Sequence, residues 1–183
     1  APGTVATGSG FEACTRCEPG KYQDSAGKTA CDSCASGSFC VEGSILPAPC
    51  RAGTHSNSTS LTSATECTPT APGFYSPTGS IAPTPCAPGT VATGSGYEVC
   101  TRCEPGKYQD VEGETACIPC PLDTYQNVSG ATACVQCPDG KRTDATGLTV
   151  EWRCTELCGA GEVGLPLYEG GLSVKPCTAC TPG

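Results

Sequence analysis

Apolar residues are scattered thinly along this chain, and their spacing predicts neither a long helix nor a long strand. Leu, Ile and Val are sparse and rarely adjacent, so no segment offers one apolar face to a large core. A short motif recurs instead, and the stretch from Cys17 to Cys31, CEPGKYQDSAGKTAC, contains all of it. Such a segment is too short and too polar to fold by its own burial. It predicts a small hairpin that is closed by a disulfide, repeated along the chain and stacked.

Each part of the motif predicts a local structure. A glycine three positions after the opening cysteine predicts a tight turn with positive φ, and Asp123, which replaces it once, tolerates the same conformation. An aromatic residue two positions further on is expected to lie over the disulfide. A later glycine suits the hairpin reversal, and the threonines at 29, 115 and 132 are expected in the return strand. The predicted fold is a small disulfide-rich, elongated, solenoid-like rod of short β-hairpins and turns with little or no helix.

A larger duplication overlies the short repeat. Residues 1–24 and 87–110 differ only at Phe11 against Tyr97 and at Ala13 against Val99. We therefore expect two repeat blocks, 1–86 and 87–183, the second diverging from about residue 149.

Composition supports a fold that depends on covalent cross-links. The 183 residues include 18 Cys, 24 Gly and 17 Pro, and the net charge is −8. So high a share of cysteine is typical of disulfide scaffolds in oxidising surroundings, so we expect an extracellular or cell-surface protein that passes through the secretory pathway. The acidic balance disfavours nucleic acid as a partner, and no apolar run approaches the roughly 18 residues that membrane insertion requires.

An internal comparison predicts the disulfide pairs. The segments 31–50 and 67–86 align, and in the second one Thr70 and Ser76 replace Cys34 and Cys40 together, which indicates that these two cysteines are partners. The remaining cysteines then pair in sequence order. The predicted bridges are Cys17 with Cys31, Cys34 with Cys40, Cys50 with Cys67, Cys86 with Cys100, Cys103 with Cys117, Cys120 with Cys134, Cys137 with Cys154, and Cys158 with Cys177.

Cys14 and Cys180 have no partner in this scheme and are expected to form bridges beyond the ends of the chain. The sequence begins with the Ala-Pro-Gly that elsewhere follows Cys86, and it ends in the same phase. We expect a window of a longer array, so that neighbouring repeats are the partners. The alternative is a head-to-tail polymer in which Cys180 of one copy bridges Cys14 of the next.

The motif C-x-x-C-x-P-G-x-Y, followed by a glycine and another C-x-x-C, resembles the ephrin-receptor-like cysteine-rich repeats of extracellular proteins. These are similar in style to tumour necrosis factor receptor modules. The resemblance covers nearly the whole chain and is weakest from Glu151 onward. It implies an elongated extracellular rod with a ladder of disulfides, but it names no ligand.

Other chemistry has weaker support. Consecutive C-x-x-C pairs at 100/103, 117/120 and 134/137 match zinc-ribbon spacing but give six ligands, which is one and a half sites. No α/β pattern surrounds them, as a thioredoxin-like redox site would require. His55 is the one histidine and stands at the aromatic position, where it reads as a substitute for tyrosine. The stretch 139–147 lacks the alternating carboxylates of a calcium loop. We therefore predict no enzyme activity and no cofactor.

The two asparagines are the sharpest site signals. Asn57-Ser-Thr and Asn127-Val-Ser are N-glycosylation sequons, each seven residues after an opening cysteine, where an exposed hairpin tip is expected. Dense Ser, Thr and Pro at 56–84 also suit O-linked glycans.

Two functions remain open. The first is a structural or assembly role, as the glycosylated rod of a surface filament, flagellar hair, coat or adhesive stalk whose partners are further copies of itself. The second is a ligand-binding module of a cell-surface receptor, with contacts near Trp152 and Tyr168.

Overall fold

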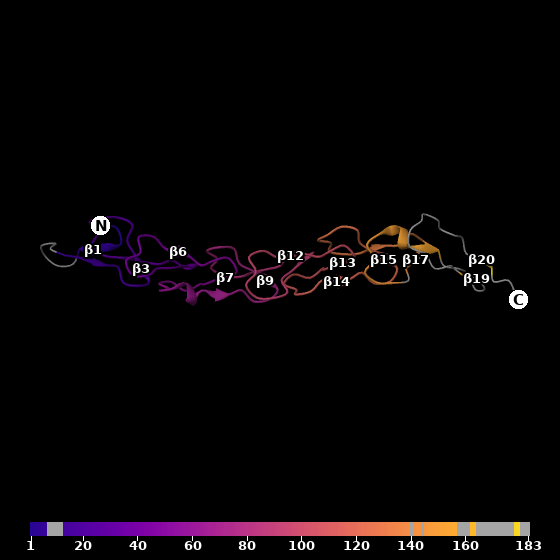
Figure 1. Ribbon diagram of the computed structural model, residues 1–183, viewed down its shortest axis with the longest axis horizontal. Helices are drawn as coiled ribbons and strands as arrows, with labels where there is room; N and C mark the ends of the chain where they lie inside the picture. The colour runs from indigo at the N-terminus through magenta and orange to yellow at the C-terminus, as the bar shows by residue number, and fades with distance from the viewer. Residues whose placement is uncertain (7–12, 140, 144, 157–161, 164–177, 180–183) are drawn as a thin grey trace.

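The protein is a long, narrow rod of stacked hairpins, as a computed structural model shows (Figure 1). The structure describes residues 1–6, 13–139, 141–143, 145–156, 162–163 and 178–179. The chain advances along the rod from β1 near one end to β19 and β20 near the other, so segments close in sequence are also neighbours in space (Figure 1). The elongated β-hairpin fold predicted from the sequence is confirmed.

Within the described residues, every strand belongs to a two-stranded antiparallel sheet. The pairs are β1 (Thr4–Ala6) with β2 (Cys14–Arg16), β3 (Lys21–Tyr22) with β4 (Asp32–Ser33), β5 (Ser38–Phe39) with β6 (Ala48–Pro49), β7 (Thr54–His55) with β8 (Thr68–Pro69), β9 (Phe74–Tyr75) with β10 (Thr84–Pro85), β11 (Thr90–Val91) with β12 (Thr101–Arg102), β13 (Lys107–Tyr108) with β14 (Ile118–Pro119), β15 (Thr124–Tyr125) with β16 (Val135–Gln136), β17 (Lys141–Arg142) with β18 (Thr155–Glu156), and β19 (Glu162–Val163) with β20 (Thr178–Ala179). Helix is confined there to two 3-10 turns, η1 (Ala64–Glu66) and η2 (Glu151–Arg153).

The return strand is displaced from its predicted position. Thr29, Thr115 and Thr132 lie in bends, and the strand that closes each hairpin follows the second cysteine, as in β4, β14 and β16. The two residues inside each C-x-x-C supply that strand. The prediction at the threonines was wrong because the disulfide, rather than β propensity, decides where the chain returns.

We name each repeat by the residues from one opening position to the next: 17–33, 34–49, 50–69, 70–85, 86–102, 103–119 and 120–136. Consecutive repeats in this set are joined by four backbone hydrogen bonds; one of them, between the first two repeats, runs from Gln23 N–H to the Ser44 carbonyl (3.1 Å). In the 17–33 repeat, Gly20 N–H donates to the Cys40 carbonyl (2.8 Å) and the Gly20 carbonyl accepts from Cys34 N–H (3.0 Å). The Gly43 N–H donates to the Cys17 carbonyl (2.8 Å). These bonds satisfy the main chain of a fold whose sheets have only two strands.

The turn glycine is required on two grounds. Gly20 has φ +84°, and a Cβ on it would meet the carbonyl oxygen of Ser60, two repeats away. Asp123 is the one described exception at this position and has φ +68°, as the sequence predicted. Its carboxylate accepts from Thr143 N–H (3.1 Å) and pairs with Arg142 (2.7 Å), which ties the turn to the next repeat.

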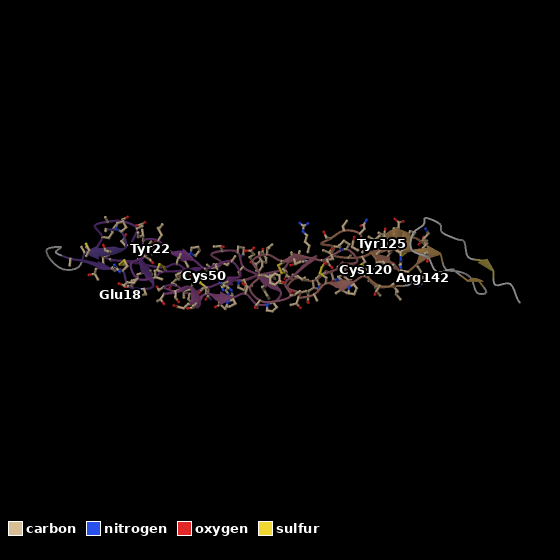
Figure 2. The ribbon with its side chains drawn as sticks, in the orientation of Figure 1. Glu18, Tyr22, Cys50, Cys120, Tyr125 and Arg142 are labelled. Atoms are coloured by element: carbon tan, nitrogen blue, oxygen red, sulfur yellow. A yellow bond between two sulfur atoms is a disulfide. The ribbon has the colours of Figure 1, made fainter. Side chains whose placement is uncertain are left out.

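The buried interior is a thin column of sulfur and small polar groups. The opening cysteines at 17, 34, 50, 86, 103 and 120 are fully buried, whereas the closing cysteines at 31, 100, 117 and 134 are only partly covered. Phe39 packs against Cys50, Leu61 and Cys67, so this aromatic ring lies against the disulfide of the next repeat. Figure 2 shows side chains projecting from both sides of the rod between the labelled Glu18 and Arg142.

Candidate functional site

The structure brings together seven of the cysteine pairs that the sequence order predicts. They are Cys17–Cys31, Cys34–Cys40, Cys50–Cys67, Cys86–Cys100, Cys103–Cys117, Cys120–Cys134 and Cys137–Cys154, with Cα atoms 5.7 to 6.2 Å apart. Cys14 is an exposed free thiol. Cys158, Cys177 and Cys180 lie outside the described residues.

The cysteines of the three pairs considered for zinc have no thiolate to offer a metal. At each of the pairs 100/103, 117/120 and 134/137, the two cysteines belong to different disulfides and join successive repeats. This arrangement contradicts the zinc-ribbon alternative. No group of three or more metal-ligating side chains occurs in the part of the chain that the structure describes.

A buried glutamine, which the sequence analysis did not single out, fixes the hairpin loop in three repeats. Gln109 is 2% exposed; its Nε2 donates to the Ala116 carbonyl (2.8 Å) and its Oε1 accepts from Val111 N–H (3.0 Å). Gln23 and Gln126 make the equivalent bonds. The signal was present in the sequence, because the same glutamine directly follows the aromatic residue in all three copies.

The 70–85 repeat has neither the buried glutamine nor the disulfide that stabilises the 34–49 repeat. Thr70 and Ser76 stand at the positions of Cys34 and Cys40, and both are fully buried. Neither the Thr70 Oγ1 nor the Ser76 Oγ has a hydrogen-bond partner. A buried hydroxyl without a partner costs free energy that a disulfide at the same place would not. The 70–85 repeat therefore has neither a cross-link nor a polar clasp of its own.

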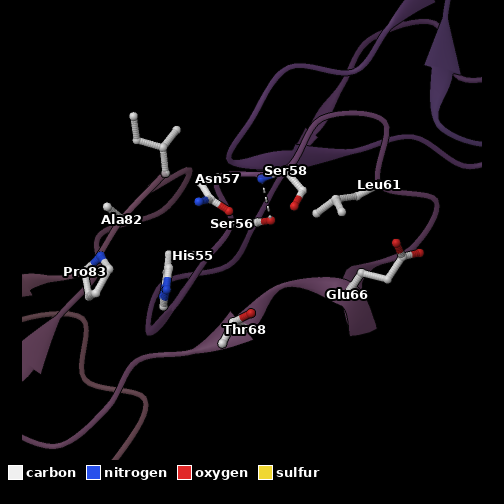
Figure 3. Close-up of a pocket in the computed structure, with 10 residues that line it drawn as sticks. His55, Ser56, Asn57, Ser58, Leu61, Glu66, Thr68, Ala82 and Pro83 are labelled. Atoms are coloured by element: carbon white, nitrogen blue, oxygen red, sulfur yellow. Dashed lines mark hydrogen bonds between the residues drawn. The ribbon is translucent and has the colours of Figure 1, made fainter.

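A hollow of about 420 Å³ lies beside this repeat, between it and the 50–69 repeat. Its wall includes His55, Asn57, Leu61 and Glu66 from one repeat and Ile81, Ala82 and Pro83 from the other. Figure 3 shows His55, Asn57, Ala82 and Pro83 around one end and Leu61 and Glu66 at the other. Both polar and apolar groups line the hollow, and the sequon asparagine is on its rim.

His55 stands where the sequence placed it, at the aromatic position in β7, where it bridges to Ser80 just as Tyr22 bridges to Ser44. Its Nδ1 is buried and has no hydrogen-bond partner. The smaller imidazole ring occupies the place that a phenol fills in the 17–33 repeat. Nothing described around it supplies a catalytic partner.

Glu66 closes the other end of the hollow and is tied to the loop before it. Its carboxylate accepts from the Thr62 hydroxyl, from Thr62 N–H (3.1 Å) and from Ser63 Oγ (3.5 Å). The Thr62 hydroxyl, together with the other donors, holds the pKa of Glu66 below its ordinary value.

The second sequon has different surroundings. Asn127 is exposed and follows β15, where Tyr125 keeps the full aromatic ring. The Tyr125 hydroxyl donates to Glu151 (3.4 Å), and partial burial, with the neighbouring carboxylate, raises its pKa. The next repeat has its own bridge, Cys137–Cys154.

The divergent segment is only partly described. Trp152 falls in η2, and its side chain lies outside the described residues, as does all of Tyr168. Gly140 and Asp144, in the stretch considered for calcium, are also outside them.

Comparison with known families agrees with this repeat geometry. Residues 3–44, 89–124 and 112–154 match the family described as tyrosine-protein kinase ephrin type A/B receptor-like, and together they cover more than half of the chain. The chain belongs to this family. The resemblance seen in the sequence is thereby confirmed. No curated protein matches the chain.

Membership in this family indicates what kind of module the ephrin-receptor-like chain is. The family is a cysteine-rich receptor-type module rather than a family of enzymes, and repeats of this kind are typical of extracellular domains. In the described part of the chain, no helix is long and apolar enough to cross a bilayer.

Proposed function

We propose that this chain is a structural module, the glycosylated shaft of an extracellular filament, coat or stalk that works as part of an array of such repeats. The continuous solenoid carries the proposal. Every boundary from the 17–33 repeat to the 120–136 repeat has the same backbone bonds between a turn position and the opening position of the next repeat. Repeats that are held together mainly by such regular contacts between neighbours are suited to form a spacer or the shaft of a filament.

Two further features support a shaft. The large apolar residues on the surface, such as Val99 (65% exposed) and Leu46 (64%), are spread along the rod. Both sequon asparagines are exposed. In this proposal Asn57 and Asn127 carry N-linked glycans, and the two blocks 1–86 and 87–183 are successive copies of one unit.

Imaging of the secreted chain tests the proposal. One copy and a tandem of two copies would be compared by negative-stain microscopy and small-angle X-ray scattering. A shaft predicts straight particles whose length doubles in the tandem. Folded-back or jointed tandems would contradict it. So would short single rods that bind a partner protein saturably and lose that binding in Trp152→Ala, which would favour the receptor alternative.

A further inference from the structure

We propose that an N-linked glycan on Asn57 packs into the hollow between the 50–69 and 70–85 repeats and holds the second repeat in place. The inference rests on the glycosylation of Asn57 that is part of the proposed function. It goes further in giving the glycan a fixed seat on the protein and a structural role.

The position of Asn57 carries the first step. Its side chain is exposed on the rim of the hollow, so a sugar attached to its amide begins there. Its backbone is held, because the Asn57 carbonyl accepts from Ser36 Oγ of the preceding repeat (3.0 Å) and Ser58 N–H donates to Ser56 Oγ (3.3 Å). A fixed attachment point lowers the entropy lost when the first sugars settle on the surface.

The chemistry of the wall carries the second step. N-acetylglucosamine has an apolar face and an acetamido group, so it suits a surface that mixes apolar groups with polar groups. Ile81 is 58% exposed and lines the hollow together with Ala82 and Pro83 of the 70–85 repeat. The imidazole ring of His55 and the exposed hydroxyl-bearing residue Ser58 belong to the same wall. Figure 3 shows His55 and Asn57 on the side of the hollow where Ala82 and Pro83 also lie.

Comparison of the 17–33 repeat with the 50–69 repeat carries the third step. The equivalent place beside Ser44 has Tyr22 in place of His55 and Asp24 in place of Asn57, so it has a larger ring and no sequon. The repeat that follows it is closed by Cys34–Cys40. The sequon and the smaller ring thus occur together beside the repeat whose cysteines became Thr70 and Ser76. A sugar bound across the boundary would replace part of the support that this disulfide gives.

Amide hydrogen exchange on the secreted, glycosylated chain tests the proposal, with two sequon variants made by removing the hydroxyl residue. The reporters for Thr59→Ala are the amides of Ser56, which donates to the Ser80 carbonyl, and Gly79, which donates to the Cys50 carbonyl. The matched control is Ser129→Ala at the other sequon, with reporters Gln126 and Gly147, which make the corresponding bonds. Glycopeptide mass spectrometry measures the occupancy of each sequon separately.

We expect exchange at Ser56 and Gly79 to become at least five-fold faster in Thr59→Ala, and exchange at Gln126 and Gly147 to change less than two-fold in Ser129→Ala. Trimming the glycan to one N-acetylglucosamine should keep the protection. Ile81→Ser should abolish the effect of the sugar but change nothing further in the Thr59→Ala background. An occupied Asn57 whose removal leaves exchange unchanged would overturn the packing and leave the glycosylated shaft standing. An unoccupied Asn57 would overturn the packing and remove that glycan from the proposed function as well.

Discussion

Substituting alanine at two glycines of one repeat distinguishes two free-energy costs. One is the cost of a strained backbone, and the other is the cost of breaking the contact between repeats. Gly20 and Gly27 have nearly the same conformation, with φ +84° and +77°. A Cβ at position 27 would meet nothing within 4 Å, whereas one at position 20 would lie 2.5 Å from the Ser60 carbonyl oxygen. Alanine at each position therefore imposes nearly the same backbone strain, but only Gly20→Ala also forces the 17–33 repeat away from Ser60 of the 50–69 repeat.

The magnitudes follow from these contacts. Alanine at positive φ costs roughly 1–2 kcal/mol, less about 0.4–1 kcal/mol because the unfolded chain loses freedom, so Gly27→Ala should cost about 1 kcal/mol. In Gly20→Ala the turn must also shift to relieve the contact with Ser60, and we expect this shift to break the bonds from Gly20 N–H to the Cys40 carbonyl and from Cys34 N–H to the Gly20 carbonyl. At about 1 kcal/mol for each hydrogen bond, the total is about 3 kcal/mol.

Native-state hydrogen exchange is the suitable assay, because stacked repeats open locally rather than all at once. The difference of about 2 kcal/mol corresponds to roughly thirty-fold faster exchange of the Cys34 amide in Gly20→Ala than in Gly27→Ala. Disulfide mapping of both variants checks that the bridges are intact. Equal exchange in the two variants, or faster exchange in Gly27→Ala, would refute the claim that the turn glycine is needed for the contact between repeats.

Three further predictions concern single repeats. The double substitution Thr70→Cys with Ser76→Cys should restore the missing bridge and stabilise the chain by about 2 kcal/mol, as expected for a loop with a sequence separation of 6, like Cys34–Cys40. Thiol titration measures bridge formation and the melting temperature measures the gain in stability, and two additional titratable thiols would contradict the prediction. Gln109→Ala should lower the free energy of unfolding by about 2 kcal/mol because two buried hydrogen bonds are lost. Faster hydrogen exchange of the Val111 amide would show this loss, and unchanged exchange there would contradict the role of Gln109 in fixing the loop. The lowered pKa of Glu66 means that its stabilising effect is present above the ordinary value of 4.5 and is lost as the pH falls below it; Glu66→Gln should flatten the acid side of the stability curve, and an unaltered curve would rule this out.

The parts of the fold that depend on covalent and backbone constraints could be predicted from the sequence. The turn glycines were identified because positive φ restricts the choice of residue, and even Asp123 obeys the same restriction. The order of the disulfides followed from the joint replacement of Cys34 and Cys40. Positive φ is a condition on a single residue, and each described disulfide closes a segment with a sequence separation of at most 17, so a single sequence records both.

The features that depend on three-dimensional contacts could not be predicted in the same way. The role of Gln109 requires knowing that its amide is buried within bonding distance of Ala116 and Val111, and a glutamine in a polar loop gives no such sign. The hollow beside Asn57 exists because Ile81 of the next repeat faces it, and a stretch of residues 50–69 alone says nothing about Ile81.

The covalent path along the rod has a mechanical consequence. Where successive disulfides are connected through C-x-x-C, tension applied to the ends of the rod passes through the disulfide bonds and the two residues between them. The loop that each disulfide closes cannot be extended by this tension. Between Cys67 and Cys86 the tension passes through residues 68–85, which no bridge encloses. Fully extended, that segment would span about 60 Å at 3.3–3.6 Å per residue, and the extension gained is this length less the distance that the segment already spans in the rod. A rod that is pulled from its ends would therefore yield first in this segment, beside Asn57.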